Sequence, residues 1–259
     1  MTVTLLVASR HTGTLRKKNI PTYERNVSLC VPCIPADVHS GAIFEMIDSI
    51  KAQEILPKEI IVALSSDTDN ISDHIKIRLQ NAAYPVSVIV TSVSFYRSPG
   101  ENRNRAVEYA SGDLISFFDA DDAMHPSRIK LLEQSFSAQP QLKIALHGLQ
   151  SSEIPWLPIT DIKTAKTMQS VDMCFMEQET RRMGQKWMSS DKLRYELTHG
   201  HSTVRRDVFE LHRFSNMQVG EDCVFVRSIL QQLCAANNSE GIVLDFPLTG
   251  YTPRAKKIQ

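Results

Sequence analysis

The sequence has no excess of charge of either sign, because its 259 residues include 29 basic and 29 acidic side chains. A chain that binds nucleic acid usually shows a basic excess or stripe, so this balance argues against a nucleic-acid partner. No apolar run approaches the length of a membrane span, and the opening MTVTLLVASR lacks the basic start and long apolar stretch of a signal peptide. We therefore expect a soluble, cytoplasmic protein that can still be peripheral to a membrane.

Cysteines are few and irregularly spaced. An odd number of cysteines without regular spacing is not typical of a disulfide framework. Cys30 and Cys33 form a CxxC pair, but no second CxxC or histidine pair completes a zinc site. Because the pair lies inside the apolar run VSLCVPCI, we interpret both residues as buried structural thiols.

Internal repeats and low-complexity segments are also missing, and apolar runs alternate with helical patterns up to about residue 150. The expected strands are 27–31, 59–64, 86–92, 114–118 and 241–248, and the expected helices include 41–53, 71–80, 126–136 and 220–233. Pro99 and Gly100 are expected to break the chain before a further helix. This alternation indicates an α/β fold, with a mainly parallel, mixed sheet flanked by helices.

Three aspartates follow the apolar run in GDLISFFDADD, residues 112–122. In α/β sheets, ligands bind beyond the carboxyl ends of the strands. Asp119 and Asp121 are two residues apart in extended chain, so their side chains point to the same side. Carboxylates this close repel one another unless a cation lies between them, and oxygen ligands suit Mg²⁺ or Mn²⁺. The alternative for the motif alone is a polar turn in which Asp122 caps the next element.

The context of this motif is more specific. PGENRNRAVEYASGDLISFFDADD resembles the central signature of family 2-like glycosyltransferases with the GT-A fold. That signature joins an Arg-Asn pair that opens a helix, a Gly-acidic turn, an apolar strand and a D-x-D-D motif. VSLCVPCIP and KEIIVALSSDTDN are similar to the first two strands of the family, and GEDCVFVRSI is similar to its late Glu-Asp motif. The resemblance covers roughly residues 27–135 and 199–230.

The resemblance implies a metal-dependent, inverting glycosyltransferase. The enzyme would move a sugar from a nucleotide-diphosphate sugar, with a UDP-sugar favoured, to a hydroxyl acceptor such as a glycan. Asp121 and Asp119 would hold Mn²⁺ or Mg²⁺, and Asp119 would also meet the ribose or diphosphate of the donor. Asp222 would be the general base for the acceptor hydroxyl, and Glu221 would orient the acceptor.

Arg103 and Asn104 are expected at the first turn of a helix, where free N–H groups favour phosphates; simple capping is the alternative. Pro32, Ser66 and Asp67 are candidates for contacts to the nucleotide base. The family often has an aspartate directly after its second strand, whereas Leu64, Ser65 and Ser66 stand there in this sequence. UDP, GDP and dTDP sugars therefore all stay open.

The resemblance also suggests a division of the chain. Residues 1–25 would form an extension with an extra strand, residues 26–150 the nucleotide-sugar-binding half, and residues 151–259 the acceptor-binding half of the same domain. His199 and His201 lie near the acceptor and sugar pockets of the family, although a lone histidine is more often a structural hydrogen-bonding group. Trp156 and Trp187 suit either sugar stacking or core packing. The basic RAKK near the C-terminus suits either a contact to the diphosphate or a frayed tail.

Two other functions stay open on the sequence. A nucleotidyltransferase shares a related sheet and also uses carboxylates with Mg²⁺, but it usually needs a basic, Gly-rich loop after the first strand. The corresponding VPCIPADVHSG contains no lysine or arginine. A glycosyltransferase-like domain that binds a nucleotide sugar or glycan without catalysis is the third possibility.

Overall fold

The computed structural model describes residues 25–65, 73–159, 167–168, 196–236 and 240–252. Ser66, Asp67, Trp187, the RAKK segment and the expected N-terminal strand lie outside the described residues.

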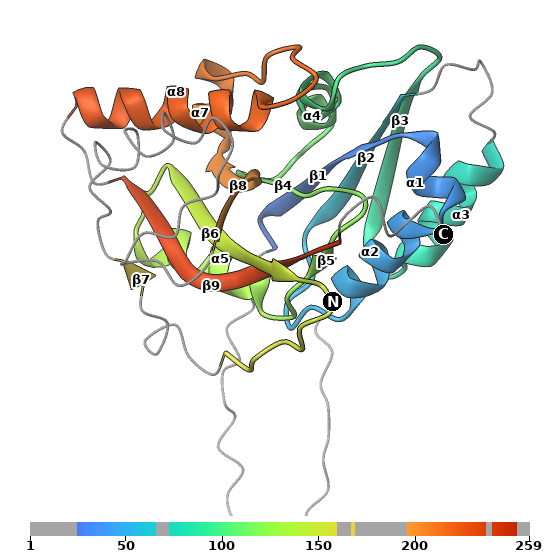
Figure 1. The fold of residues 1–259 in the computed structure, drawn as a ribbon, viewed down its shortest axis with the longest axis horizontal. Helices are drawn as coiled ribbons and strands as arrows, with labels where there is room; N and C mark the ends of the chain where they lie inside the picture. The colour runs from blue at the N-terminus through green and yellow to red at the C-terminus, as the bar shows by residue number, and fades with distance from the viewer. Residues whose placement is uncertain (1–24, 66–72, 160–166, 169–195, 237–239, 253–259) are drawn as a thin grey trace, which may run out of the picture.

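The described chain forms one mixed sheet of nine strands in the order β3-β2-β1-β4-β8-β6-β9-β5, with β7 also paired to β9 (Figure 1). The strands are β1 (Val27–Cys33), β2 (Glu59–Ser65), β3 (Ser87–Val93), β4 (Leu114–Phe117), β5 (Ala123–Met124), β6 (Ile144–Ser151), β7 (Thr167–Met168), β8 (Glu196–Arg205) and β9 (Gly241–Tyr251). β3, β2, β1 and β4 run parallel, and β8 is antiparallel to both β4 and β6. The expected α/β class, a mixed sheet flanked by helices, is confirmed.

Helices cover both faces of the sheet. They are α1 (Pro35–His39), α2 (Ala42–Lys51), α3 (Asp73–Ala83), α4 (Pro99–Glu108), α5 (Arg128–Ala138), α7 (Arg206–Leu211) and α8 (Glu221–Ala235). Leu29 and Val31 pack with α2, α3 and α5 on one face. Cys30 packs with α4, α7 and α8 on the other face, along the upper side of Figure 1. Because both faces are buried, the parallel strands read as continuous apolar runs.

The start of α4 differs from the expectation that Pro99 and Gly100 break the chain. Ser98 Oγ accepts a hydrogen bond from the Glu101 N–H at 3.2 Å, and Glu101 Oε2 accepts one from the Ser98 N–H at 3.0 Å. This reciprocal capping lets Pro99 occupy the first helical turn, where its missing N–H has no partner to lose. Gly100 is required here because a side chain would collide with the Ser215 carbonyl.

The cysteines of the first strand behave as expected. Cys30 and Cys33 are buried free thiols, and burial raises the pKa of both. Cys234 is disulfide-bonded, which the irregular cysteine spacing did not indicate. Among the described residues, we find no helix with the length and hydropathy that a bilayer crossing requires.

Candidate active site

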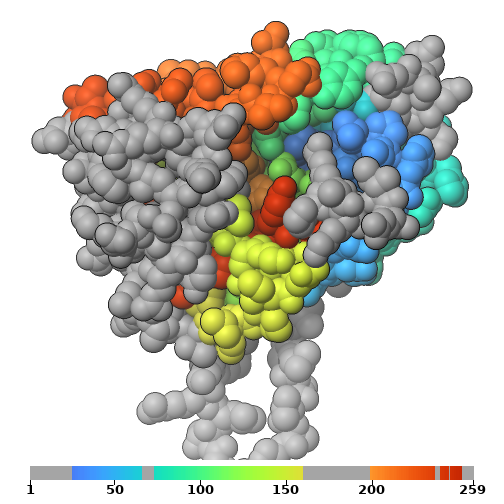
Figure 2. All heavy atoms as spheres, in the orientation of Figure 1, coloured from blue at the N-terminus to red at the C-terminus, as the bar shows by residue number. Residues whose placement is uncertain are grey.

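A cleft of about 430 Å³ opens at the carboxyl ends of β1 and β4, below the first turns of α4 and α8. Figure 2 shows this face of the molecule hollowed beneath these helices. Six of the predicted site residues line the cleft: Pro32, Arg103, Asp119, Asp121, Glu221 and Asp222. The segments that bring them together lie far apart in the sequence, so the fold assembles this site.

Arg103 joins two of the carboxylates. Its Nη2 donates to Asp119 Oδ1 at 2.7 Å, and its Nη1 donates to Glu221 Oε1 at 2.5 Å. The Arg103 side chain is 4% exposed, the Glu221 side chain 7% and the Asp119 side chain 35%. One buried guanidinium therefore ties the end of β4 to the start of α8, and its two terminal nitrogens both contact carboxylates.

The charges in the cleft shift one another. Burial lowers the pKa of a guanidinium, but Asp119, Glu221 and Asp222 outweigh it and raise the pKa of Arg103. Burial would raise the pKa of Asp119, yet Arg103 and His201 hold it well below its ordinary value. Burial dominates at Glu221 and raises its pKa although Arg103 opposes the effect. Asp119 is thus kept ionised inside the cleft.

Gly200 in β8 lies beneath the charged side chains. A Cβ atom on Gly200 would be 3.3 Å from Arg103 Nη2, 3.4 Å from Asp222 Oδ2 and 3.7 Å from Asp119 Oδ2. The carboxylates from the end of β4 and the start of α8 thus converge above a backbone that carries no side chain. Asp222 Oδ1 accepts the Cys223 N–H of its own helix at 2.8 Å, which holds the carboxyl group at the helix start.

A cluster of possible metal ligands lies next to the carboxylates that Arg103 binds. Ligand atoms of Asp119, Asp122 and His201 are all within 4.8 Å of one another. His201 Nε2 is 3.4 Å from Asp122 Oδ2 and 3.5 Å from Asp119 Oδ2. The D-x-D spacing predicts that Asp119 and Asp121 act as a pair, with at most a capping role for Asp122. The structure shows Asp122 buried beside His201, while Asp121 lines the cleft.

The electrostatics of Asp122 indicate how this group could be used. Burial raises the pKa of Asp122 to about 7, and the neighbouring charges of Asp119 and Asp121 add to the effect. Asp122 Oδ1 accepts the Thr252 N–H at 3.2 Å. Since a dication offsets both desolvation and carboxylate repulsion, these oxygen and nitrogen donors fit a divalent metal.

The polar side chains from Asn102 to Arg105 connect α4 to the end of β2, to Asp119 and Glu221, and to the loop before α8. The Asn102 amide donates to Ser65 Oγ at the end of β2, at 2.9 Å. Arg105 Nη2 donates to the Leu64 carbonyl at 2.8 Å. Asn104 does not line the cleft, because its side chain bonds to the N–H and the carbonyl of Phe214 at 3.0 and 2.9 Å. We therefore assign Asn104 to the positioning of the loop before α8.

Trp156 and His199 are not among the residues that line the cleft. Trp156 packs over Gly250, where a Cβ atom would be 3.1 Å from the indole ring, and its edge meets His125 at 5.0 Å between ring centroids. This environment supports packing at Trp156. His199 is buried near Asp222, and burial lowers its pKa.

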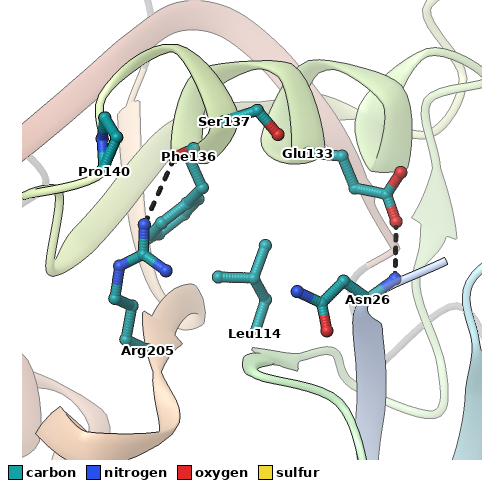
Figure 3. A pocket seen from close by; sticks show the side chains of 7 residues that line it. All are labelled: Asn26, Leu114, Glu133, Phe136, Ser137, Pro140 and Arg205. Carbon is teal, nitrogen blue, oxygen red and sulfur yellow. Dashed lines mark hydrogen bonds between the residues drawn. The ribbon is translucent and has the colours of Figure 1, made fainter. Parts of the chain in front are cut away.

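Another cavity, of about 290 Å³, lies at the opposite ends of the parallel strands (Figure 3). Asn26, just before β1, and Leu114, the first residue of β4, line it. The Glu133 carboxylate in its wall accepts the Asn26 N–H at 3.1 Å, and Arg205 Nη2 donates to the Phe136 carbonyl at 3.2 Å. Its polar groups thus tie the chain before β1 and the end of β8 to α5.

Comparisons with solved structures show which known proteins share this fold. The chain resembles S. aureus TarS 1–349 at 17% identity and a TM-score of 0.61, over 90% of this chain and 62% of that one. It also resembles glucosyl-3-phosphoglycerate synthase from Mycobacterium tuberculosis, solved with Mn²⁺ and UDP, at 16% identity and a TM-score of 0.54, over 90% and 75%. A mannosyltransferase from Pyrobaculum calidifontis, with GDP-Man and Mn²⁺, matches at 17% identity and a TM-score of 0.50, over 88% and 59%.

At this identity these structures establish the GT-A fold, and the chain spans less than two thirds of the length of the TarS chains. No curated protein matches the sequence. The model of the glycosyl transferase family 2 matches residues 28–210, which include β1, the acidic end of β4 and β8. The chain therefore belongs to glycosyl transferase family 2.

Proposed function

We propose that this protein is a metal-dependent, inverting glycosyltransferase that moves a sugar from a nucleotide-diphosphate sugar to a hydroxyl group, most simply on a glycan. One observation carries the proposal. The carboxylates of Asp119 and Asp222 converge above Gly200 in a single cleft, at the carboxyl ends of parallel strands. This is the edge of an α/β sheet at which ligands bind.

Asp222 is the proposed general base. It stands in the first turn of α8, where the helix dipole favours an ionised carboxylate. Its Oδ2 points toward the space above Gly200, while Oδ1 is held by the helix. An ionised carboxylate so placed can accept the proton of an acceptor hydroxyl as that oxygen attacks the sugar. Inversion follows if the hydroxyl approaches from the side opposite to the nucleotide.

Arg103 and Glu221 are proposed as positioning residues. The sequence predicts a phosphate contact for Arg103 and an acceptor contact for Glu221. In the structure these two side chains bind each other, and Arg103 also binds Asp119. This network fixes the donor-side carboxylate relative to the start of α8, which carries the proposed base.

A divalent cation fits the acidic end of β4, held by Asp119 with Asp121 or with Asp122 and His201. A bound cation neutralises the charge that the nucleoside diphosphate gains as the glycosidic bond breaks. The Mn²⁺ in the mycobacterial and archaeal structures supports this proposal.

UDP-sugars are the favoured donors. TarS has been solved with UDP and with UDP-GlcNAc, and the mycobacterial synthase with UDP. The archaeal mannosyltransferase holds GDP-Man, so GDP-sugars belong in any test. Pro32 lines the cleft and remains a candidate for base contact, with Ser66 and Asp67 as further candidates.

A thermal-shift panel of UDP-, GDP- and dTDP-sugars, with and without Mn²⁺, tests the proposal. A ligand that binds the native state raises the melting temperature, so the true donor should stabilise the protein in the presence of metal. Asp121→Asn should lose metal-dependent nucleotide binding and transfer while keeping the fold. Full transfer activity in this variant would contradict the assigned role of Asp121.

The reaction product separates the alternatives. A glycosyltransferase releases nucleoside diphosphate, whereas a nucleotidyltransferase releases pyrophosphate. A binding domain without catalysis would show metal-dependent nucleotide-sugar binding, with neither transfer nor slow hydrolysis of the donor.

A further inference from the structure

Large apolar side chains are exposed on two loops beside the cleft. Phe95 and Tyr96 belong to the loop between β3 and α4, and each is 49% exposed. Met217 and Val219 belong to the loop before α8, and they are 46% and 83% exposed. Apolar side chains that are exposed singly are ordinary, whereas a group of them in one place marks a binding surface.

A hydrogen bond joins the two loops and gathers these side chains. The Tyr96 hydroxyl donates to Gln218 Oε1 at 2.8 Å, and both residues line the cleft together with Asp222. The two loops meet beside α4, at the upper edge of Figure 1. The exposed apolar residues all lie within one position of this bonded pair. We call residues 95–97 and 217–219 the apolar rim.

The apolar rim is formed before a ligand binds, because both loops are anchored to α4. Reciprocal capping between Ser98 and Glu101 fixes the end of the first loop. Asn104 holds the N–H and the carbonyl of Phe214 in the second loop, and the Phe214 ring stacks on Phe225 with centroids 4.0 Å apart. A ligand on the rim therefore loses little affinity to the ordering of these loops.

The chemistry of the apolar rim does not suit an anionic ligand. Its one charged side chain, Arg97, donates to Glu101 Oε1 at 2.6 Å and lies over the Phe95 ring at 4.3 Å. The Tyr96 hydroxyl is bonded to Gln218, so the ring presents mainly apolar surface to a ligand. An apolar group therefore fits the rim better than a phosphate or a carboxylate does.

The apolar rim also lies where an acceptor would enter. Gly220 is the one residue between Val219 and α8, and its φ of +83° turns the chain into the helix. Asp222 stands in the first turn of that helix. An acceptor whose hydroxyl reaches Asp222 therefore has its neighbouring atoms beside Val219, with Tyr96 on the facing loop.

We propose that the acceptor carries an apolar aryl or alkyl group next to the sugar that bears the accepting hydroxyl, and that Tyr96 and Val219 bind this group. The inference rests on the proposed function, in which Asp222 meets the acceptor hydroxyl. It adds a substrate class to that function: glycosides with an apolar aglycone, rather than free or phosphorylated sugars. The aglycone takes no part in the bond exchange, so its binding lowers KM and leaves kcat nearly unchanged.

The test compares methyl and octyl glycosides of glucose, galactose, mannose and N-acetylglucosamine as acceptors, below their micelle concentrations. Release of nucleoside diphosphate is measured with Mn²⁺ and the donor that stabilises the protein most. The octyl member of an accepted pair should have a kcat/KM about 10- to 100-fold higher, the usual effect of burying one large apolar group, mostly through KM. Equal kcat/KM within every accepted pair would overturn the inference.

Substitutions assign this octyl preference to the apolar rim. Val219→Asn and Tyr96→Ser should each lower it by about 3- to 10-fold, because each removes part of the buried apolar area. Tyr96→Phe keeps the ring and should retain most of the preference. Leu211→Asn is the matched control, because Leu211 is 73% exposed at the end of α7 and is not among the residues that line the cleft. An octyl preference that is unchanged in both Val219→Asn and Tyr96→Ser would refute the role of the rim.

Calorimetry gives an answer even if none of these sugars is accepted. With UDP and Mn²⁺ present, octyl glycosides should bind the wild-type protein about 10- to 100-fold more tightly than methyl glycosides. Binding that is no tighter, in a protein that still hydrolyses its donor slowly, would overturn the inference and leave the proposed function standing. Tighter octyl binding without transfer or hydrolysis of any donor would contradict the proposed function alone. Equal binding, with a wild-type dimer that Val219→Asn dissociates, would assign the rim to a second copy of the chain instead.

Discussion

Replacing Arg103 by methionine is the sharpest perturbation of the site. Methionine keeps much of the apolar volume but removes the charge that pairs with Asp119 and Glu221. Removing one partner of a buried ion pair costs about 3–5 kcal/mol, because the other charge stays buried. The Glu221 side chain is 7% exposed, so this range applies to it. The Asp119 side chain is 35% exposed, so the loss of its ion pair with Arg103 adds only about 0–1 kcal/mol to this cost.

We therefore expect Arg103→Met to lower the free energy of unfolding by about 3–5 kcal/mol at pH 7–8. Urea unfolding measures this change, with an unchanged slope as evidence that the folded state is intact. Arg105→Met is the matched control on the same helix, because Arg105 donates to the Leu64 carbonyl and to Asn102 and has no carboxylate among these partners. It should lose less stability.

The loss should depend on pH with a defined sign. Burial already raises the pKa of Glu221, and without Arg103 it would rise further. A carboxyl group with a raised pKa destabilises the folded state as pH increases from its unfolded value, about 4.3, through its folded value. The deficit of Arg103→Met should therefore be smaller at pH 5 than at pH 8, and Glu221→Gln in that background should restore part of it. A deficit below about 1 kcal/mol, the size of an exposed pair, at every pH would refute the reasoning.

Three further predictions concern the surroundings of the site. Gly200→Ala should leave the melting temperature nearly unchanged but lower kcat/KM by about 10- to 100-fold, because its methyl group would lie 3.3 Å from Arg103 Nη2 and shift the guanidinium that aligns Asp119 and Glu221; wild-type kinetics would contradict this. Asn104→Ala removes two hydrogen bonds to Phe214 and should lower the free energy of unfolding in urea by about 1–3 kcal/mol. An unchanged free energy would show that these bonds do not stabilise the loop before α8. Burial raises the pKa of Glu59, but hydrogen bonds from Ser28 and Ser111 outweigh it and lower the pKa. The stabilisation that these bonds give to the folded state is therefore present at neutral pH and lost as pH falls below about 4.3. Glu59→Gln should reduce this acid dependence, and an identical pH profile would exclude the contribution.

Much of the fold is predictable because the parallel strands are buried on both faces. The apolar runs at 59–64 and 86–92 correspond to β2 and β3 within one residue at each end. β6 and β8 were not identified, because buried polar side chains interrupt their pattern. His147 and Thr203 are both fully buried, and their partners are Arg128 and Ser116. Such pairings appear only when the strands are placed side by side.

The candidate site, like the sheet, was predictable only in part. Its acidic motifs were recognisable, and the parallel topology explains why the ends of β1 and β4 meet in one cleft. The partners of Arg103 were not predictable, because Glu221 is 118 residues away and a helix start favours any anion. For His201 the sequence favours a structural hydrogen-bonding role, as for most lone histidines, and does not indicate that it lies beside Asp119 and Asp122. Only the pairing of β4 with β8 places it there.

The central claim is that Asp119 serves the donor while Asp222 serves the acceptor in one cleft. Calorimetric binding of a UDP-sugar with Mn²⁺, followed by measurement of UDP release, tests it on wild type, Asp119→Asn and Asp222→Asn. We expect Asp119→Asn to lose donor binding, and Asp222→Asn to bind the donor like wild type but release almost no UDP with acceptor present. Wild-type turnover in Asp222→Asn, or undiminished donor binding in Asp119→Asn, would contradict the account.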